Sequence, residues 1–178
     1  MNLHLSLLLI CRSSYAFTGQ WRQRGVATLS KRRALPQRLE DVAQLVRPGE
    51  VVADIGCDHG QLACSLAASG RSPTVIAIDV NADPLANAVL AIERAGLGGR
   101  VEARLGDGIG ALTRGDNVTT LCLAGMGEKS MRGALRGGAA LRALGVRALV
   151  LQPPPRADAA QLVSGCEAAW PETCLPLM

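Results

Sequence analysis

The first 39 residues of the chain contain no acidic residue, whereas seven basic residues lie between Arg12 and Arg38. From residue 41 onward there are 12 basic and 14 acidic residues, which gives that part of the chain a net charge of −2. The formal charge of +4 is therefore a property of the amino-terminal end alone. It gives no indication that the body of the protein is a basic nucleic-acid-binding domain.

Metal-binding and membrane-spanning patterns are absent as well. The six cysteines form no Cys-x-x-Cys pair and neither histidine has a metal-ligand spacing, so no metal site is expected. An even number of cysteines in so apolar a chain indicates small buried residues in a reducing compartment. The apolar segment from Leu3 to Ile10 is far shorter than the roughly 20 residues that span a bilayer, and no other segment qualifies.

Residues 1–34 have the composition of a targeting leader, and we expect them to be disordered. An acid-free segment with arginine and serine is typical of transit peptides for a mitochondrion or a plastid. An apolar core followed by a basic segment also fits the two-part leader of a complex plastid. The alternative is a disordered tail or a misassigned start codon, and the protein would then be cytoplasmic. Residues 35–178 have the length of one domain.

Buried strands alternate with helices along this domain. Residues 35–46 have apolar side chains at helical spacing, with Arg38 pointing outward. Strands are predicted at 51–55, 74–78, 101–105, 118–124 and 146–151. The continuous apolar run at 74–78 is typical of a parallel strand that is buried on both faces. Further helices are predicted at 60–68, 84–95, 128–144 and 157–169, and Asp83 can cap the helix that begins at residue 84. The order predicts an α/β fold with a doubly wound sheet of about five parallel strands.

The segment from Val51 to Leu62, VVADIGCDHGQL, has the pattern of the opening unit of a nucleotide-binding sheet. A buried strand is followed by a turn with two glycines and by the start of a helix. Gly56 would let the backbone come close to a ligand. Asp54 would lie at the carboxyl end of the strand, where such sheets bind their ligands.

Three acids, Asp54, Asp79 and Asp107, stand just past the ends of the first three predicted strands. Because the carboxyl ends of parallel strands share one edge of a sheet, we expect the three carboxylates to lie together. They could receive a cationic amino group, the two hydroxyls of a ribose and an exocyclic amine, respectively. S-adenosylmethionine has all three groups. Taken singly, each acid is equally well explained as a cap of a helix or turn.

A dinucleotide is the alternative ligand for this sheet. Its fingerprint is Gly-x-Gly-x-x-Gly, but Asp58 occupies the place of the second glycine here. The charge of Asp58 would repel a pyrophosphate, whereas a sulfonium cation meets no such repulsion. A nicotinamide-dependent oxidoreductase is therefore the less favoured reading.

Five motifs follow one another between residues 54 and 153. They are DIGCDHGQL (54–62), AIDVNADPLANA (77–88), RLGDGI (104–109), LAGMG (123–127) and LVLQP (149–153). In this order they resemble the bacterial family of tRNA adenine-N1 methyltransferases that modify a D-loop adenine, and the sequence around Arg38 and Leu39 resembles the start of that family. The resemblance covers about Leu35 to Pro153. It implies a Rossmann-like class I methyltransferase fold, S-adenosylmethionine as cofactor and tRNA as substrate.

The resemblance also implies a cofactor site of eight residues. Three would line the methionine side, two would hold the ribose and flank the adenine, two would meet the adenine edge, and the last would belong to the floor of the transfer site. In that order they are Asp54, Gly56, His59, Asp79, Val80, Asp107, Gly108 and Ala124. His59 could instead be a hydrogen-bonded turn residue.

The transfer site itself would take three further residues from the resemblance. Gly125 and Met126 would complete its floor, and Asp58 would orient the acceptor base. Methyl transfer from a sulfonium depends on in-line positioning, so no obligatory base is expected.

The sequence departs from the family at several places. Gln61 stands where the family has an aromatic residue on which a flipped base could stack, and Glu128 replaces an expected glycine. The chain ends where the sixth and seventh strands and the helical carboxyl extension that grips tRNA would follow. The alternative function is therefore a cofactor-binding remnant without catalysis, or a partner subunit.

One helix face could replace part of the missing RNA grip. Lys129, Arg132 and Arg136 are spaced so that they share a face of the predicted helix just past the transfer site. They could contact phosphates, or they could form an ordinary solvated face.

Overall fold

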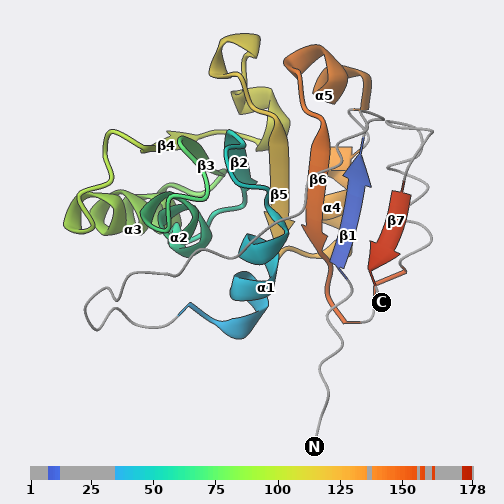
Figure 1. The fold of residues 1–178 in the computed structure, drawn as a ribbon, viewed down its shortest axis with the longest axis horizontal. Helices are drawn as coiled ribbons and strands as arrows, with labels where there is room; N and C mark the ends of the chain where they lie inside the picture. Colours follow the sequence, from blue (N-terminus) through green and yellow to red (C-terminus); the bar gives the residue numbers. More distant parts are fainter. Residues whose placement is uncertain are drawn as a thin grey trace, which may run out of the picture.

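The computed structural model describes residues 8–12, 35–135, 138–155, 157, 158, 162 and 174–177. Its centre is a parallel sheet whose strands lie in the order β4-β3-β2-β5-β6 (Figure 1). The predicted doubly wound α/β sheet with five parallel strands is confirmed. The strands are β2 (Val52–Ile55), β3 (Val75–Asp79), β4 (Val101–Leu105), β5 (Thr120–Ala124) and β6 (Ala148–Gln152).

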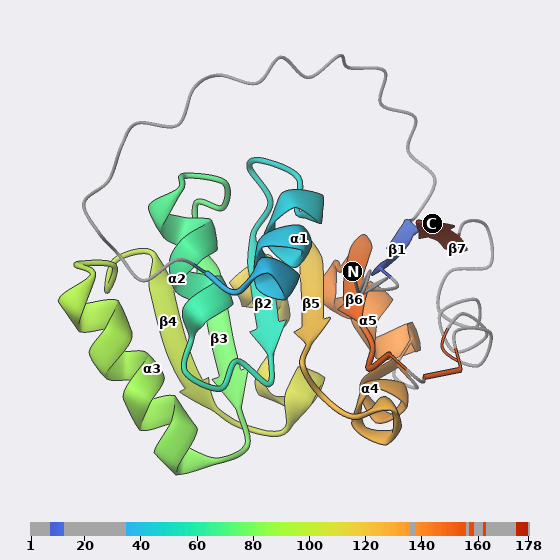
Figure 2. The ribbon, with the colours of Figure 1, turned by 90° about the horizontal axis from the view of Figure 1, so that it is seen from below.

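Helices cover both faces of the sheet (Figure 2). On one face lie α1 (Gln37–Leu45), α2 (Gln61–Ala68) and α3 (Ala82–Arg94). On the other lie α4 (Glu128–Leu135), α5 (Gly138–Leu144) and the short 3₁₀ helix η1 (Gly108–Ala111). A second 3₁₀ helix, η2 (Arg114–Asp116), lies in the connection to β5. Within the described residues, no helix is both long enough and apolar enough to cross a bilayer.

The apolar runs of the central strands result from burial on two faces. Successive side chains of a strand point to opposite sides of the sheet. Val52 and Val75 accordingly pack beneath α1–α3, whereas Ala53 and Ile76 pack beneath α4 and α5. All four side chains are at most 2% exposed, which explains why the sequence shows no polar alternation there.

Two strands that the sequence did not predict extend the sheet beyond β6. Strand β1 (Leu8–Arg12) pairs with β6 in the antiparallel sense, and β7 (Cys174–Leu177) pairs with β1. Figure 1 shows both at the edge of the sheet, β1 in blue and β7 in red. Strand β1 lies within the segment that was expected to be a disordered leader, and residues 1–7 and 13–34 of that segment lie outside the described residues. Strand β7 follows residue 151, the end of the last predicted strand, and no strand was predicted after it.

The helix expected at 128–144 is described in two parts, α4 and α5, and residues 136 and 137 between them lie outside the described residues. The predicted cap of α3 was wrong. Helix α3 begins at Ala82 with Asn81 as its N-cap, so Asp83 is not the cap. The side chain of Asn81 donates instead to Oδ1 of Asp79, at 3.3 Å. The helix expected at 157–169 lies almost wholly outside the described residues.

Candidate active site

Two adjoining pockets open at the carboxyl ends of the parallel strands, and Gly56 lines both. The small pocket, of about 150 Å³, lies between α1 and the turns that follow β2 and β5. The large pocket, of about 660 Å³, lies between the turns that follow β3 and β4 and helix α4. The small pocket is lined by six of the predicted site residues, namely Asp54, Gly56, Asp58, His59, Ala124 and Gly125. The large pocket is lined by Gly56, Asp79, Val80, Asp107, Gly108 and Met126.

Asp54 is a buried acid in the small pocket. The residue is 3% exposed, and its Oδ2 has no hydrogen-bond partner. Burial raises the pKa of this carboxyl to about 7; the backbone N–H of Ala63 lowers it, and the charge of Asp79 raises it. The carboxyl is therefore partly protonated near neutral pH. A cation that entered the small pocket would favour its charged form.

The turn after β2 brings the backbone to the wall between the pockets. The N–H groups of Gly56 and Cys57 donate to the carbonyl of Ile78 at 2.9 and 3.0 Å, which ties the turn to the end of β3. Gly56 has a φ of +71°, a conformation that other residues rarely adopt. A Cβ at this position would also lie 2.9 Å from Cε of Met126. The positive φ and the contact with Met126 both disfavour a side chain at position 56, so the backbone of Gly56 itself lines the two pockets.

Asp79 is held in a fixed orientation at the end of β3. Its Oδ2 accepts a hydrogen bond from the N–H of Asp58 at 3.0 Å, and its Oδ1 accepts one from the N–H of Asn81 at 2.9 Å. The residue is 7% exposed and lines the large pocket. Each carboxylate oxygen has about two acceptor directions. Because Oδ1 also accepts from the side-chain amide of Asn81, it is Oδ2 that can still receive a hydroxyl group of a ligand.

An arginine braces the segment that carries Asp107 and Gly108. Arg104 of β4 donates to both carboxylate oxygens of Asp116, at 2.9 and 3.0 Å, and to the carbonyl of Ala111 at 2.8 Å. The hydrogen bonds from Arg104 lower the pKa of Asp116 to about 2, so this bidentate pair is ionised at neutral pH. The connection that forms this wall of the large pocket is thus tied to β4 at two points.

Val80 gives the large pocket an apolar surface at its rim. The residue directly follows β3 and is 63% exposed, which is unusual for a large apolar side chain beside a buried strand. A flat aromatic ring that lay on Val80 would shield it from water.

The predicted RNA-contact residues lie outside the two pockets as far as the structure describes them. Lys129 is exposed on α4, and Nη1 of Arg132 lies 3.8 Å from Oε1 of Glu128 one helical turn earlier. Arg136 lies outside the described residues. Their contact with RNA stays a prediction.

A family model described as a methyltransferase domain matches residues 35–163, which is most of the chain. This chain belongs to the methyltransferase-domain family. The matched segment contains every residue that lines the two pockets.

The methyltransferase domain has a curated relative in Bacillus subtilis, a tRNA (adenine(22)-N(1))-methyltransferase. The two are 32% identical over 119 residues, which are 67% of this chain and 49% of the relative. The chain therefore spans about half the length of this curated relative.

Solved structures with the same fold have been found in other bacteria. An uncharacterized protein from Listeria monocytogenes is 35% identical with a TM-score of 0.70, over 76% of this chain and 57% of its own. A putative tRNA (m1A22) methyltransferase from Streptococcus pneumoniae, in complex with S-adenosyl-L-methionine, is 34% identical with a TM-score of 0.64. That match covers 67% of this chain and 56% of the other.

The small pocket of the methyltransferase domain also contains residues that sequence reasoning missed. Arg38 was assigned to the outer face of α1, and it is exposed, but its side chain also lines the small pocket. Its Nη1 lies 3.0 Å from the position that a Cβ on Gly125 would take. The position of Arg38 in the first turn of its helix was the available signal, because a cation is disfavoured there.

Cys57 and Gln61 line the same pocket. Burial, followed by the charge of Asp54, raises the pKa of the Cys57 thiol to about 12, so the thiol is protonated at neutral pH and is no nucleophile. Gln61 is exposed at the position where an aromatic residue was expected. The four aromatic residues of the chain, Tyr15, Phe17, Trp21 and Trp170, all lie outside the described residues. In the described part of the chain, no three acidic, histidine or cysteine side chains gather as a metal site would require.

Proposed function

We propose that this protein is an S-adenosylmethionine-dependent methyltransferase that acts on N1 of an adenine in tRNA. The observation that carries the proposal is the position of Asp54, Asp79 and Asp107 along two adjoining pockets at one edge of the sheet. The similarity to the tRNA methyltransferase of Bacillus subtilis and to a structure that contains S-adenosyl-L-methionine supports it.

The residues of the two pockets fit the groups of this cofactor. In the large pocket, Oδ2 of Asp79 can accept a hydrogen bond from a ribose hydroxyl, Val80 can cover a face of the adenine, and Asp107 can accept from the exocyclic amine. In the small pocket, the free oxygen of Asp54 suits an ammonium group. The bare backbone of Gly56 lies where the ligand would cross from one pocket to the other.

A dinucleotide fits the same pockets less well. The side chain of Asp58 is 68% exposed at the small pocket, so its charge would face the second phosphate of a pyrophosphate. Nicotinamide-dependent redox chemistry is for this reason not proposed.

S-adenosylmethionine, when bound, supplies an electrophilic methyl group. The protein's own contribution is placement, because the rate of such a transfer depends on the alignment of the reacting atoms. Gly125 and Met126 form the wall beside the junction of the pockets, and Asp58 is placed to orient the acceptor base. His59 lies with Nε2 3.7 Å from Oδ1 of Asp58, which is too long for a hydrogen bond.

Two measurements on the full chain test the proposal. Calorimetric titration should show that S-adenosylhomocysteine binds and that NAD does not. Transfer of a labelled methyl group to unmodified tRNA, followed by nucleoside analysis, should give 1-methyladenosine. The matched variant Asp79→Asn keeps an acceptor oxygen for one turn N–H but loses the charge, and we expect it to lose affinity by about tenfold or more. Absence of S-adenosylhomocysteine binding by the folded wild-type protein would contradict the proposal.

A non-catalytic subunit that binds the same cofactor is the second candidate. It is favoured by Gln61, which lines the small pocket at the position where an aromatic residue was expected, since an enzyme that flips a base usually stacks it on a ring. Binding of S-adenosylhomocysteine with no methyl transfer to any tRNA would support this candidate.

We also propose that the amino-terminal segment directs the protein to a mitochondrion or a plastid. The support is its acid-free, arginine-containing composition. Mass spectrometry of the protein purified from its native cells would show whether Leu8–Arg12, the residues of β1, remain on the mature chain. Location of the endogenous protein in the cytosol by cell fractionation would contradict the proposal.

A further inference from the structure

Two cysteines from opposite ends of the chain lie opposite each other at the edge of the sheet. Strands β1 and β7 pair in the antiparallel sense, and their register places Cys11 opposite Cys174. Figure 1 shows the two strands side by side beyond β6, β1 in blue and β7 in red. Almost the whole length of the chain separates the two cysteines in the sequence, so the fold alone brings them together.

Pro176 determines which kind of pair the two cysteines form. Along an antiparallel ladder, pairs that exchange two backbone hydrogen bonds alternate with pairs that exchange none. Leu9 is paired with Pro176, which has no N–H, so this pair is of the second kind. Cys11 and Cys174 lie two positions along the ladder and are therefore of the second kind as well. The nitrogen of Pro176 then faces the open side of β7, the last strand of the sheet, where a proline is tolerated.

A pair of this kind lies within the range that a disulfide can span. Its α-carbons are about 4.5 Å apart, compared with about 5.5 Å in a hydrogen-bonded pair. The α-carbons of disulfide-bonded cysteines are usually about 4.4–6.8 Å apart. The pair is at the short end of this range, so a disulfide there would be strained and more easily reduced than an ordinary structural one.

Two other cysteines of the chain are protected from disulfide exchange. Cys57 and Cys122 are buried, and both thiols are free. Burial raises the pKa of the Cys57 thiol to about 12 and that of the Cys122 thiol well above its ordinary value. Because the thiolate is the form that attacks a disulfide, neither reacts readily at neutral pH.

We propose that Cys11 and Cys174 form an intramolecular disulfide that joins the first strand of the sheet to the last. The two thiols lose two protons and two electrons, and a small disulfide such as glutathione disulfide takes them up and becomes two thiols. The bond closes a loop of almost the whole chain and holds β7 to β1, the strand that covers β6. Because the bond is strained, it opens in a reducing compartment and forms in an oxidising one. The inference is independent of cofactor and substrate and applies to any form of the protein that retains β1.

Peptide mapping tests the pairing directly. The full chain is equilibrated in glutathione buffers of increasing oxidised fraction, alkylated in denaturant and digested with trypsin and a glutamate-specific protease. Cleavage isolates residues 1–12 and 173–178, each with one of the two cysteines, whereas Cys166 falls in residues 157–167. We expect the oxidised chain to give residues 1–12 linked to residues 173–178. It should also contain two fewer alkylated cysteines than the reduced chain.

Thermal unfolding tests what the bond does to the fold. A disulfide that closes a long loop restricts the unfolded chain, so oxidation should raise the midpoint of the wild type by about 5–15 °C. Cys11→Ser and Cys174→Ser should each melt with the reduced wild type, whatever the buffer. Cys166→Ser is the matched control, because it removes the cysteine nearest to Cys174 in the sequence. We expect this control to keep the difference between oxidised and reduced protein.

The peptide map of the wild type decides the question even if a serine variant does not fold. A link between residues 157–167 and 173–178 would overturn the inference, because Cys166 would then be the partner of Cys174. Links only between two copies of the chain would overturn it too. So would a folded wild type that shows no link in the most oxidising buffer.

Discussion

Asp54 is the residue whose charge state the small pocket controls. Its pKa of about 7 in the folded chain lies above the ordinary value of 3.8, chiefly because burial disfavours the charged form. Between these two values the folded state binds more protons than the unfolded state does. The contribution of Asp54 to stability is therefore full below about pH 4 and is lost as the pH rises toward 7.

This sign gives a prediction for Asp54→Asn. The wild type should lose stability across that interval with a slope of up to about 1.4 kcal/mol per pH unit from this group, and the variant should lack the slope. At pH 8 the variant should unfold at a higher urea concentration than the wild type, although it binds S-adenosylhomocysteine more weakly. Urea titrations at a series of pH values measure both curves. Curves that run parallel at all pH values would show that the carboxyl is not perturbed.

Sequence reasoning reached some site residues and missed others for a physical reason. Asp54, Asp79 and Asp107 could be predicted because each follows a buried strand, and parallel strands bring their ends together. Arg38 was missed because its place in the first turn of α1 says that a cation is unusual there but not what it approaches, and its approach to Gly125 depends on how α1 packs on the sheet. Helical periodicity places Arg38 on the solvent side of α1 and carries no information about what lies beside the end of the helix.

At the scale of elements, the connection between β4 and β5 depends on one brace. The bidentate pair of Arg104 and Asp116 ties η2 to β4, while Asp107 and Gly108 lie between them on the wall of the large pocket. The depressed pKa of Asp116, about 2 against an ordinary 3.8, means that the pair stabilises the fold fully above about pH 4. This stabilisation is lost as the pH falls toward 2.

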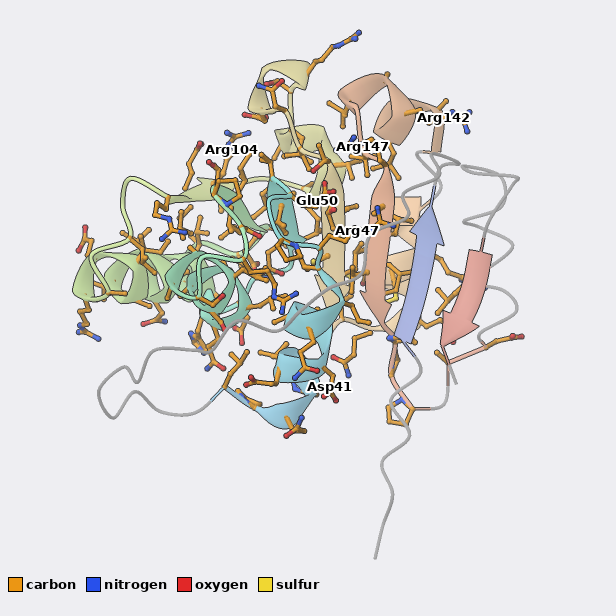
Figure 3. All side chains as sticks on the ribbon, in the orientation of Figure 1. Asp41, Arg47, Glu50, Arg104, Arg142 and Arg147 are labelled. Carbon is orange, nitrogen blue, oxygen red and sulfur yellow. The ribbon has the colours of Figure 1, made fainter. Side chains whose placement is uncertain are left out.

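We predict that Arg104→Lys loosens this wall. Lysine keeps the charge but cannot reproduce the two parallel hydrogen bonds, so affinity for 5′-methylthioadenosine should fall by about three- to tenfold. Calorimetric titration measures the change. The control is Arg147→Lys, because Arg147 pairs with Glu50 at 3.4 Å on the exposed surface near the amino ends of β2 and β6 (Figure 3). Such surface pairs contribute little, so the control should bind as the wild type does. Equal effects of the two variants would contradict the role of the brace.

The elements themselves differed in how far the sequence could predict them. The runs that became β2, β3, β5 and β6 were recognisable because burial on both faces leaves a largely apolar pattern, whereas β4 at the edge of the parallel sheet carries Glu102 and Arg104. Both α4 and α5 lie within the one helical pattern that the sequence shows across residues 128–144.

At the scale of the whole molecule, the first strand, β1, covers the outer edge of β6, and the last strand, β7, covers the outer edge of β1. Strand β1 pairs with β6 from Leu9 to Arg12, and β7 pairs with the other side of β1. Without β1, the backbone groups on one side of β6 would form an open sheet edge, which invites association with other chains. Local patterns could not predict this pairing, because it joins segments from the two ends of the chain.

The substitution Ile10→Pro tests the pairing. Ile10 lies between Val150 of β6 and Leu175 of β7, so a proline there removes an N–H from one of two strand pairs. We expect a loss of about 1–2 kcal/mol and a lower midpoint of thermal unfolding, measured by circular dichroism. Ile10→Thr, which retains the N–H, should melt closer to the wild type. If the two variants melt alike, β1 is not part of the sheet in solution.

The shared wall at Gly56 also bears on how the spent cofactor leaves. A ligand that occupies both pockets is a chelate: once one half is in place, the other half is already at high local concentration. If the proposed function holds, S-adenosylhomocysteine, which retains both halves after the methyl group has gone, should dissociate slowly and compete with fresh cofactor. The turnover rate in the cell would then depend on the rate at which another enzyme cleaves S-adenosylhomocysteine into its two fragments. Each fragment would occupy a single pocket and bind weakly.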